Sequence, residues 1–155
     1  MSLITDRLIL RSWSNPEVTA VLDGQRPPHW AEDFPAEGDR VIAGLFAEHP
    51  LWLGEFGHRQ VIERHTGLVV GSIGLFWPPS DGTVEIGYGI VASRRGLGYA
   101  SEATGALTAF VLGNAGVHTV EAEVELSNPA SVRVLEKAGF RRSGADERVA
   151  RYTRR

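Results

Sequence analysis

Hydrophobic residues recur at two different spacings in the second half of the chain. In residues 83–91 every second side chain is large and apolar or aromatic, from Val84 to Ile90. That period of two is typical of a strand with one buried face. In residues 100–112 apolar side chains return at every third or fourth position, which predicts an amphipathic helix. This part of the chain therefore predicts a strand, a short glycine-containing loop and a helix in succession.

The same spacings, with turn residues between them, divide the rest of the chain. Asn15 and Pro16 are typical of a helix start, as N-cap and first helical residue, and Gly139 suits the left-handed residue that ends a helix. Further strands are predicted at residues 8–10, 60–63, 68–76, 119–126, 140–142 and 148–152, and further helices at 15–24, 37–48 and 129–138. The apolar stripe of the helix at 37–48 is expected to consist of Val41, Ile42, Leu45 and Phe46.

This order of elements predicts an α+β fold around a mixed sheet. A helix connects the strands at 83–91 and 119–126. Because such crossover connections join parallel strands, these two are expected to pair in parallel.

The amino-acid composition excludes several classes of protein but does not indicate a particular reaction. The 155 residues suit a single domain, 1–155, and the net charge of −3 argues against a nucleic-acid partner. Cysteine is absent, which excludes disulfides, thiolate metal sites and cysteine nucleophiles. No apolar run is long enough to cross a membrane and the N-terminal segment lacks the order of a signal peptide, so a cytoplasmic protein without membrane contact is expected. The five histidines show no paired spacing; they are expected at the surface or in loops, and no metal site is expected.

The loop between the strand and the helix suggests a phosphate site. Backbone N–H groups of such a loop point outward, and the following helix adds the positive end of its dipole. The Gly-Lys-Ser/Thr ending of a nucleoside-triphosphate loop is missing, and Ala103 stands where the third glycine of a dinucleotide fingerprint would fall. Glycines at such a joint are also common for steric reasons alone. The loop by itself therefore leaves a phosphate site and a plain turn open.

Three separated stretches give the loop a more specific meaning. They are Thr5-Asp6-Arg7-Leu8-Ile9-Leu10-Arg11, then Glu85-Ile86-Gly87-Tyr88 through Arg95-Gly96-Leu97-Gly98-Tyr99-Ala100-Ser101-Glu102-Ala103, and Asn128-Pro129-Ala130-Ser131 through Lys137-Ala138-Gly139-Phe140. Taken alone, the third stretch predicts no more than a capped helix start. In this order and spacing, the three resemble the Gcn5-related N-acetyltransferase (GNAT) superfamily, and within it the RimJ/RimL-like proteins. The middle stretch fits the superfamily pattern Arg/Gln-x-x-Gly-x-Gly/Ala with Arg95, Gly98 and Ala100.

The resemblance implies a fold, a reaction and a co-substrate. The fold would be a single GNAT-like domain with a mostly antiparallel sheet of about seven strands, a splayed parallel pair and about four helices. The reaction would move an acetyl group from acetyl-CoA to an amine without a metal. The CoA pyrophosphate would lie on the loop amides and the pantetheine arm along the preceding strand, where a backbone N–H would polarise the thioester carbonyl. The residues so assigned to acetyl-CoA binding are Ile90, Val91, Arg95, Gly96, Gly98, Tyr99, Ala100, Ser101 and Asn128.

Direct attack on a thioester needs a group that removes a proton from the amine. Glu85 matches the strand glutamate that serves as base in histone-type members, and strand alternation turns it away from the apolar face. Glu123 matches the base of some ribosomal-protein acetyltransferases and is the second candidate. A solvated edge, or a site for a cationic substrate, is the alternative for the alternating Glu121, Glu123 and Glu125.

The departing thiolate in turn needs a proton. Many superfamily members use a tyrosine on the short helix at 129–138, but Leu135 occupies that position here. Ser131 matches the serine of RimL-like members and is the candidate proton donor or thiol-orienting group. Tyr88 and Tyr99 stay open as substitutes.

The acceptor region is the part of the site that the resemblance defines least. The aromatic, proline-rich segment at residues 26–35 follows the first strand, where the family shapes its acceptor pocket. Trp30 and Phe34 are the candidate substrate-binding residues, with core packing as the alternative. The expected function is an acetyl-CoA-dependent N-acetyltransferase for a protein N-terminus or a small-molecule amine. A non-catalytic acyl-CoA-binding sensor on the same fold is the alternative, and both a monomer and a homodimer are open.

Overall fold

The computed structural model describes residues 2–114 and 116–155, which form one eight-stranded sheet with helices on both sides. Helices and strands follow one another as β1 Leu3–Ile4, β2 Leu8–Ser12, α1 Asn15–Leu22, α2 Glu37–Leu45, η1 Pro50–Leu53, β3 His58–Glu63, β4 Val69–Leu75, β5 Thr83–Ile90, η2 Ala92–Arg94, α3 Tyr99–Leu112, β6 Thr119–Glu125, α4 Pro129–Lys137, β7 Arg141–Ala145 and β8 Val149–Arg154. The order across the sheet is β1-β2-β3-β4-β5-β6-β8-β7. The neighbouring strands run antiparallel except β5 and β6, which are parallel. The expected α+β fold with one parallel pair is therefore confirmed.

The sequence-based strands and helices are all present, with one addition and two corrections. β1 is additional: it is two residues long, and so short a strand carries no hydrophobic period. The N-cap of α1 is Ser14, so Asn15 lies inside the helix and not at its cap. α2 ends at Leu45 and buries Asp39 and Ala43, so the predicted stripe is wrong at Val41, which is 53% exposed.

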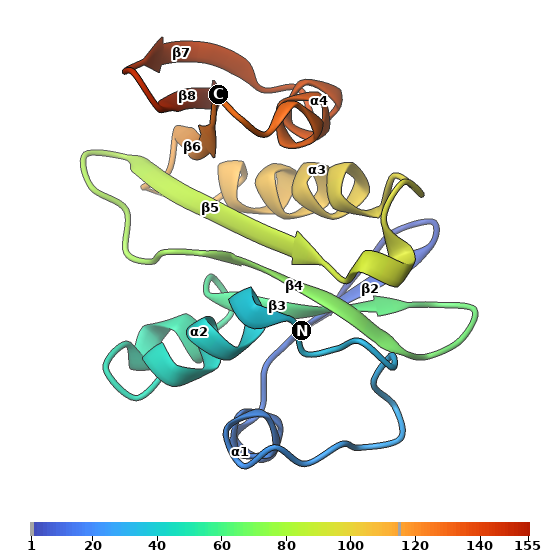
Figure 1. Cartoon of the computed structure of the whole chain (residues 1–155). Coiled ribbons are helices and arrows are strands. Elements are labelled where there is room, and N and C mark those ends of the chain that lie inside the picture. The colour runs from blue at the N-terminus through green and yellow to red at the C-terminus, as the bar shows by residue number, and fades with distance from the viewer. Residues whose placement is uncertain (1, 115) are drawn as a thin grey trace.

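Two helical layers enclose the sheet (Figure 1). α3 packs against β2, β4, β5 and β6, and α4 packs against α3 and β6. α1 and α2 contact one another and lie on the opposite side of the sheet from α3 in Figure 1. The apolar core follows from this arrangement, with Leu107 and Val111 of α3 fully buried. None of the helices in the described ranges is long and apolar enough to cross a bilayer.

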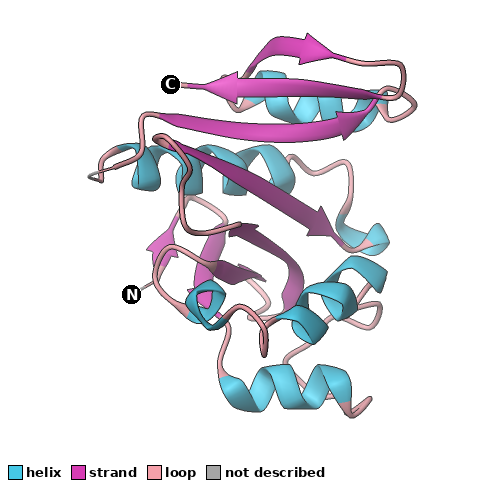
Figure 2. Ribbon diagram, turned by 90° about the vertical axis from the view of Figure 1, so that its left-hand side faces the viewer, coloured by secondary structure: helices cyan, strands magenta, loops and turns pink. Residues whose placement is uncertain are grey.

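The parallel pair opens after a few residues. Thr83, Val84 and Glu85 of β5 pair with Thr119, Val120 and Glu121 of β6, and no further pair follows. From there β6 continues beside β8, while β5 continues beside β4 up to Ile90 (Figure 2). The β6-facing edge of the second half of β5 is thus left for another hydrogen-bonding partner.

One histidine departs from the expectation of surface or loop positions. His58 lies in β3 and is only 2% exposed. Its ring contacts the rings of Phe46, Trp52 and Phe76, and it occupies the space above Gly74, where a Cβ would come within 2.0 Å of the imidazole. The expectation is therefore wrong for His58, because the missing side chain at Gly74 makes room for it in the core.

Candidate active site

The glycine loop leads directly into the first turn of α3. Gly96 and Gly98 have φ values of +79° and +84°, a left-handed region that favours glycine. Gly98 is the N-cap residue of the helix that begins at Tyr99. The N–H groups of the first helical turn have no partner within their own helix, and the helix dipole makes this end positive. The loop therefore has the two features that the sequence predicts for an anion site: free backbone N–H groups and the positive end of a helix dipole.

The N-terminal stretch holds this loop in place. The Arg7 Nε donates to Glu102 Oε1 at 2.8 Å, and its Nη1 donates to the Leu97 carbonyl at 2.7 Å. The Thr5 hydroxyl and the Arg7 backbone N–H both donate to Glu102 Oε2. Burial opposes ionisation of Glu102, but these hydrogen bonds outweigh it and hold its pKa below the ordinary value. The Thr5-Asp6-Arg7 stretch of the sequence is thus a brace for the loop.

A second brace lies beneath the loop. The Tyr99 hydroxyl donates to Glu63 Oε2 at 2.7 Å, and Arg94 approaches the same carboxylate at 3.3 Å. The Tyr99 side chain is 4% exposed. With its hydroxyl engaged by Glu63, the Tyr99 side chain serves the fold and not the thiolate, which leaves its backbone N–H as the group available to a ligand.

The hydrogen-bonding pattern of β5 determines which amides face the open gap. The Val91 N–H donates to the Val70 carbonyl and the Phe76 N–H to the Glu85 carbonyl, so the odd-numbered residues of β5 bond to β4. In an antiparallel ladder the intervening residues direct their N–H and C=O groups to the other side. The N–H groups of Tyr88 and Ile90 therefore point to the gap beside β6. Of the two residues expected to offer a thioester-polarising N–H, Ile90 fits and Val91 does not.

Two hydroxyl groups meet across this gap. The Oη of Tyr88 on β5 lies 2.5 Å from the Oγ of Ser131 on α4. The Ser131 N–H in turn donates to Oδ1 of Asn128, which caps α4. Burial raises the pKa of Tyr88 although its hydrogen bond with Ser131 acts in the opposite direction. Leu135, at the position of the missing tyrosine, is a buried core side chain. The structure thus brings together Ser131 and one of its two tyrosine substitutes.

The candidate bases lie at the point where β5 and β6 separate. Glu85 is paired in register with Glu121, and Glu123 follows on the same face of β6. Although Glu85 keeps an exposed surface, partial burial of its carboxyl raises its pKa, and the nearby carboxylates of Glu123 and Glu121 raise it further. The arrangement groups both predicted bases and shifts the pKa of Glu85 in the direction that favours a general base.

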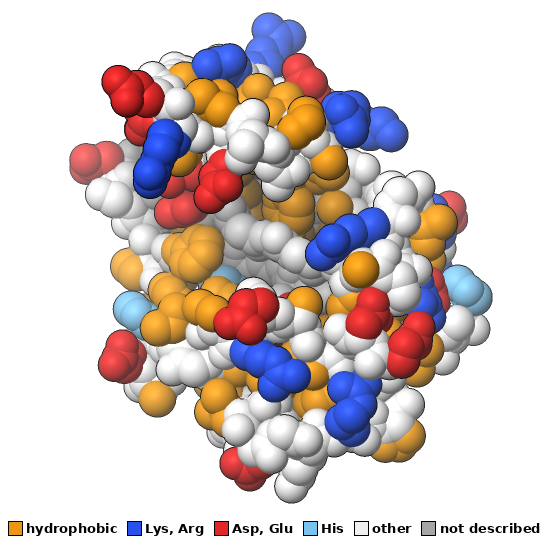
Figure 3. All heavy atoms as spheres, in the orientation of Figure 1, with side chains coloured by type: hydrophobic (Ala, Val, Ile, Leu, Met, Phe, Trp, Pro, Cys, Tyr) orange, Lys and Arg blue, Asp and Glu red, His pale blue; other side chains and the backbone are white. Residues whose placement is uncertain are grey.

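A cavity of about 420 Å³ opens on the face of the sheet that α2 covers. Figure 3 shows a hollow in the middle of this side of the molecule, bordered by hydrophobic side chains, with acidic side chains gathered at its upper left. Gly87 and Gly89 form part of its floor, and a Cβ at Gly89 would meet no atom within 4 Å. The floor reaches the open edge of β5, because Tyr88 and Ile90 line the cavity too.

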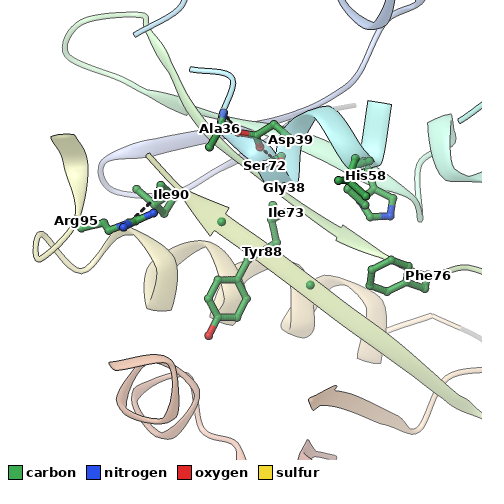
Figure 4. Close-up of a pocket in the computed structure, with 14 residues that line it drawn as sticks. Ala36, Gly38, Asp39, His58, Ser72, Ile73, Phe76, Tyr88, Ile90 and Arg95 are labelled. Carbon is green, nitrogen blue, oxygen red and sulfur yellow. Dashed lines mark hydrogen bonds between the residues drawn. The ribbon is translucent and has the colours of Figure 1, made fainter. Parts of the chain in front are cut away.

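Three polar side chains of this cavity were not found by sequence reasoning. The Ser72 hydroxyl donates to Asp39 Oδ1 in a short hydrogen bond, and the Ala36 N–H donates to Asp39 Oδ2 at 2.8 Å. Burial raises the pKa of Asp39 against the effect of both hydrogen bonds, and burial lowers the pKa of His58 to about 4. In Figure 4 Asp39 and Ser72 lie next to each other beside β5, and Tyr88 points away from them. The available signal was Asp39 itself, an acid in phase with the apolar Ala43 and Phe46.

Arg95 closes the other end of the cavity. Its Nε donates to the Ile90 carbonyl at 3.0 Å, as the dashed line in Figure 4 marks. Arg95 therefore connects the loop to the end of β5, and its side chain borders the cavity as well as the loop.

Trp30 and Phe34 belong to the core and not to the cavity wall. They are 4% and 0% exposed, and their rings contact each other at 5.2 Å between centroids. Their segment is fixed by Asp33, which accepts hydrogen bonds from the backbone and the side chain of Ser93. Buried among other side chains, Trp30 and Phe34 offer an acceptor no surface, and the packing alternative holds.

Known proteins share this sequence and fold. Residues 5–141 match the protein family described as an acetyltransferase (GNAT) domain. The chain is 28% identical over 156 residues to the uncharacterized N-acetyltransferase p20 of Bacillus licheniformis, covering 92% of this chain and 84% of that protein. A putative GnaT-family acetyltransferase from Bordetella pertussis superposes with a TM-score of 0.73 at 25% identity, over 100% of this chain and 99% of that one.

A RimL ribosomal L7/L12 alpha-N-protein acetyltransferase, solved in complex with coenzyme A, superposes with a TM-score of 0.74. It is 18% identical, over 99% of this chain and 97% of that one, so this likeness concerns the fold. The family match covers most of the chain and agrees with the loop, the opened parallel pair and the helices found here. The chain therefore belongs to the GNAT acetyltransferase family.

Proposed function

We propose that this protein transfers the acetyl group of acetyl-CoA to a primary amine by direct attack on the thioester. The observation that carries the proposal is a row of outward-facing backbone amides in two sections, separated by residues 91–95, where the N–H groups of Val91, Arg94 and Arg95 are bonded within the protein. It starts at Tyr88 and Ile90 on the open edge of β5 and resumes in the loop and first turn of α3. An extended pantetheine arm needs an open strand edge and a pyrophosphate needs several convergent N–H donors, so the row matches both parts of one ligand.

The residues present fit acetyl-CoA at both ends of this row. The amides of Gly96, Gly98, Ala100 and Ser101 would hold the pyrophosphate. Arg7 and Lys137 border the same surface as Gly98 and Ser101 and would add positive charge there. Asn128 fixes the start of α4 beside the pantetheine path. The complex of the RimL protein with coenzyme A shows that a protein of this fold takes the ligand, which supports the assignment.

The residues around the gap account for the chemistry of transfer. A neutral amine nitrogen attacks the carbonyl carbon of the thioester, and the Ile90 N–H stabilises the negative charge that develops on the carbonyl oxygen. The carbon–sulfur bond then breaks and the thiolate takes a proton from the Ser131 and Tyr88 hydroxyl pair. An alkylammonium gives up one proton before the attack and a second as the amide forms. One of these two protons restores the hydroxyl pair that protonated the sulfur. The other is taken by the base and released to solvent.

Glu85 is the proposed base, with Glu123 as the second candidate. A carboxylate becomes a better proton acceptor as its pKa rises toward that of the group it deprotonates. Burial of the Glu85 carboxyl and the repulsion from Glu123 and Glu121 both raise its pKa. The same three carboxylates favour a cationic acceptor by attraction at the mouth of the site. We propose further that the enzyme acts in the cytoplasm, as a monomer or a homodimer.

A thiol-release assay tests the function directly. Because the protein has no cysteine, every thiol that reacts with a disulfide dye comes from released CoA. Calorimetry measures acetyl-CoA binding, and turnover is followed with a panel of small amines, spermidine and a short peptide with a free N-terminus. Enzymatic function predicts saturable thiol release that depends on an amine. Tight acetyl-CoA binding without amine-dependent release would support the sensor alternative, and failure to bind acetyl-CoA would reject both.

A further inference from the structure

The buried acid Asp39 is hydrogen-bonded to Ser72 of β4, close to the end of β5 where the proposed reaction places the thioester. Its partner Ser72 is paired with Gly89 in the register of β4 and β5. Gly89 lacks a side chain and immediately precedes Ile90, whose N–H faces the thioester in the proposed reaction. Because a Cβ at Gly89 would meet nothing within 4 Å, the space above it is open. A carboxylate thus borders an open floor beside the reacting position.

The Asp39 carboxylate is held in one orientation and still has capacity to accept. Ser72 Oγ donates to Oδ1 and the Ala36 N–H donates to Oδ2, so each oxygen uses one of its two lone pairs. Asp39 is 3% exposed and is carried by a helix that packs against its neighbours, so its position does not depend on a mobile loop. An ammonium group in the cavity would complete the hydrogen bonding of this buried acid.

Away from Asp39 and Ser72, and from Arg95 at the end next to the loop, the cavity is lined mainly by apolar side chains and glycines, and its volume limits the size of the acceptor. Val41 and Ile42 of α2 and Phe76, which follows β4, line the space with apolar side chains. His58 lies at the same wall, and with a pKa of about 4 it carries no charge at neutral pH. A volume of about 420 Å³ is in the range of pockets for small molecules. Val41 lines the cavity although its side chain is 53% exposed. An apolar ligand in the cavity would cover this side chain.

We propose that Asp39, oriented by Ser72, is the positioning residue for the acceptor, and that the acceptor is a small primary amine with an apolar body. This inference rests on the proposed function. The ammonium group donates one hydrogen bond to Asp39, and its apolar body lies between α2 and the floor of Gly87 and Gly89. After one proton has left toward Glu85, the nitrogen keeps its hydrogen bond to Asp39 and turns its lone pair to the thioester.

Steady-state kinetics of an Asp39→Asn variant tests the assignment. Asparagine keeps the size of the side chain and one acceptor oxygen but removes the charge. Loss of a charge-assisted hydrogen bond predicts an increase of roughly 10- to 100-fold in KM for phenethylamine or isoamylamine. The KM for acetyl-CoA and its dissociation constant remain at their wild-type values. Ser72→Ala is expected to show a smaller increase in the same parameter, because Ser72 only orients Asp39.

A second pair of variants keeps the test valid if Asp39→Asn folds poorly. Val41→Lys places a cation at an exposed position of the cavity and is expected to lower kcat/KM for the small amines. Leu51→Lys is the matched control, since Leu51 is 60% exposed but does not line the cavity. It is expected to leave kcat/KM unchanged. Equal effects of the two lysine variants, or unchanged amine KM in a folded Asp39→Asn protein, would overturn the assignment.

The amine panel tests the acceptor assignment separately from the proposed acetyl transfer. The highest kcat/KM is expected for small apolar amines. Higher kcat/KM for spermidine or for the peptide N-terminus would overturn the acceptor assignment while leaving acetyl transfer in place. Acetyl-CoA binding without thiol release from any amine would overturn the proposed function and this inference with it.

Discussion

Glu85 of β5 lies close to Glu121 and Glu123 of β6 at the point where the sheet opens. Partial burial and the repulsion from these two carboxylates distinguish Glu85 from an ordinary surface acid. Glu85 and Glu121 are register partners of the parallel pair, so their side chains leave the sheet on the same face. Glu123 follows two residues later on β6. Burial is the largest cause of the raised pKa of Glu85, and the two neighbouring carboxylates add to it. A strand carboxylate in water would show neither effect.

Glu85→Gln should therefore lower turnover without weakening acetyl-CoA binding. Removing a general base typically lowers the rate by about 100-fold or more. In the wild type, kcat/KM for the amine should fall as the pH drops through the raised pKa of Glu85, because the protonated carboxyl accepts no proton. Glu123→Gln should move this acidic limb to lower pH, since it removes one of the like charges. Wild-type rates for Glu85→Gln across the pH range would reject the base role.

The loop and the first turn of α3 form a single binding element that depends on its glycine conformation. Gly98 combines a φ of +84° with a position at the helix start, and a Cβ there would lie 3.2 Å from Nη2 of Arg7. A side chain at Gly98 would strain the backbone and push against Arg7. It would also cover the backbone N–H groups of the loop. The element is therefore sensitive to substitution in ways that the core of α3 is not.

Gly98→Glu should abolish acetyl-CoA binding, because it adds a negative charge where the pyrophosphate lies. Thermal denaturation with and without ligand measures this. A ligand at 100 times its Kd stabilises a protein by about 2.7 kcal/mol, which is roughly 5–11 °C for a domain of this size. The variant should lose that shift. Gly24→Glu is the control, because Gly24 also has a positive φ, +71°, and lies outside the loop; it should keep the full shift. An undiminished shift in Gly98→Glu would contradict the loop assignment.

The sequence predicts those helices and strands that depend on local pattern. Strand β5, helix α3 and the cap at Asn128 follow from periodicity and capping chemistry. The cavity does not, because Asp39, Ser72 and His58 come from separate elements that only the fold brings together. Trp30 and Phe34 were candidates for the acceptor site because aromatic residues suit both a pocket and a core, and composition cannot distinguish these. Nor does the sequence show that the Val91 amide is unavailable to a ligand, because its hydrogen bond to Val70 depends on the β4–β5 register.

Two acids, the half-buried Glu102 and the buried Glu63, connect segments that are far apart in the sequence. Glu102 of α3 accepts hydrogen bonds from Thr5 and Arg7 at the start of the chain. Glu63 of β3 likewise accepts hydrogen bonds from Tyr99 and Arg94, which flank the loop. Burial opposes ionisation of both carboxyls, yet these hydrogen bonds and cations hold their pKa values below normal. Both contacts support the ligand loop, so binding and overall stability depend on the same groups.

Glu102→Gln should consequently destabilise the protein in a pH-dependent way. A carboxyl whose pKa is lower in the folded protein contributes stability above its unfolded pKa, about 4.5. That contribution is lost as the pH falls through the lower folded value. Removing a hydrogen-bonded charge costs about 1.5–3 kcal/mol, or roughly 3–12 °C in Tm for a domain of this size. Melting curves by circular dichroism should show this gap at pH 7 and a smaller gap near pH 3. Glu48→Gln, at an exposed residue, should show no such gap at either pH. If the gap for Glu102→Gln is the same at both values, the charge of Glu102 is not what braces the loop, and its role reduces to the shape of the side chain.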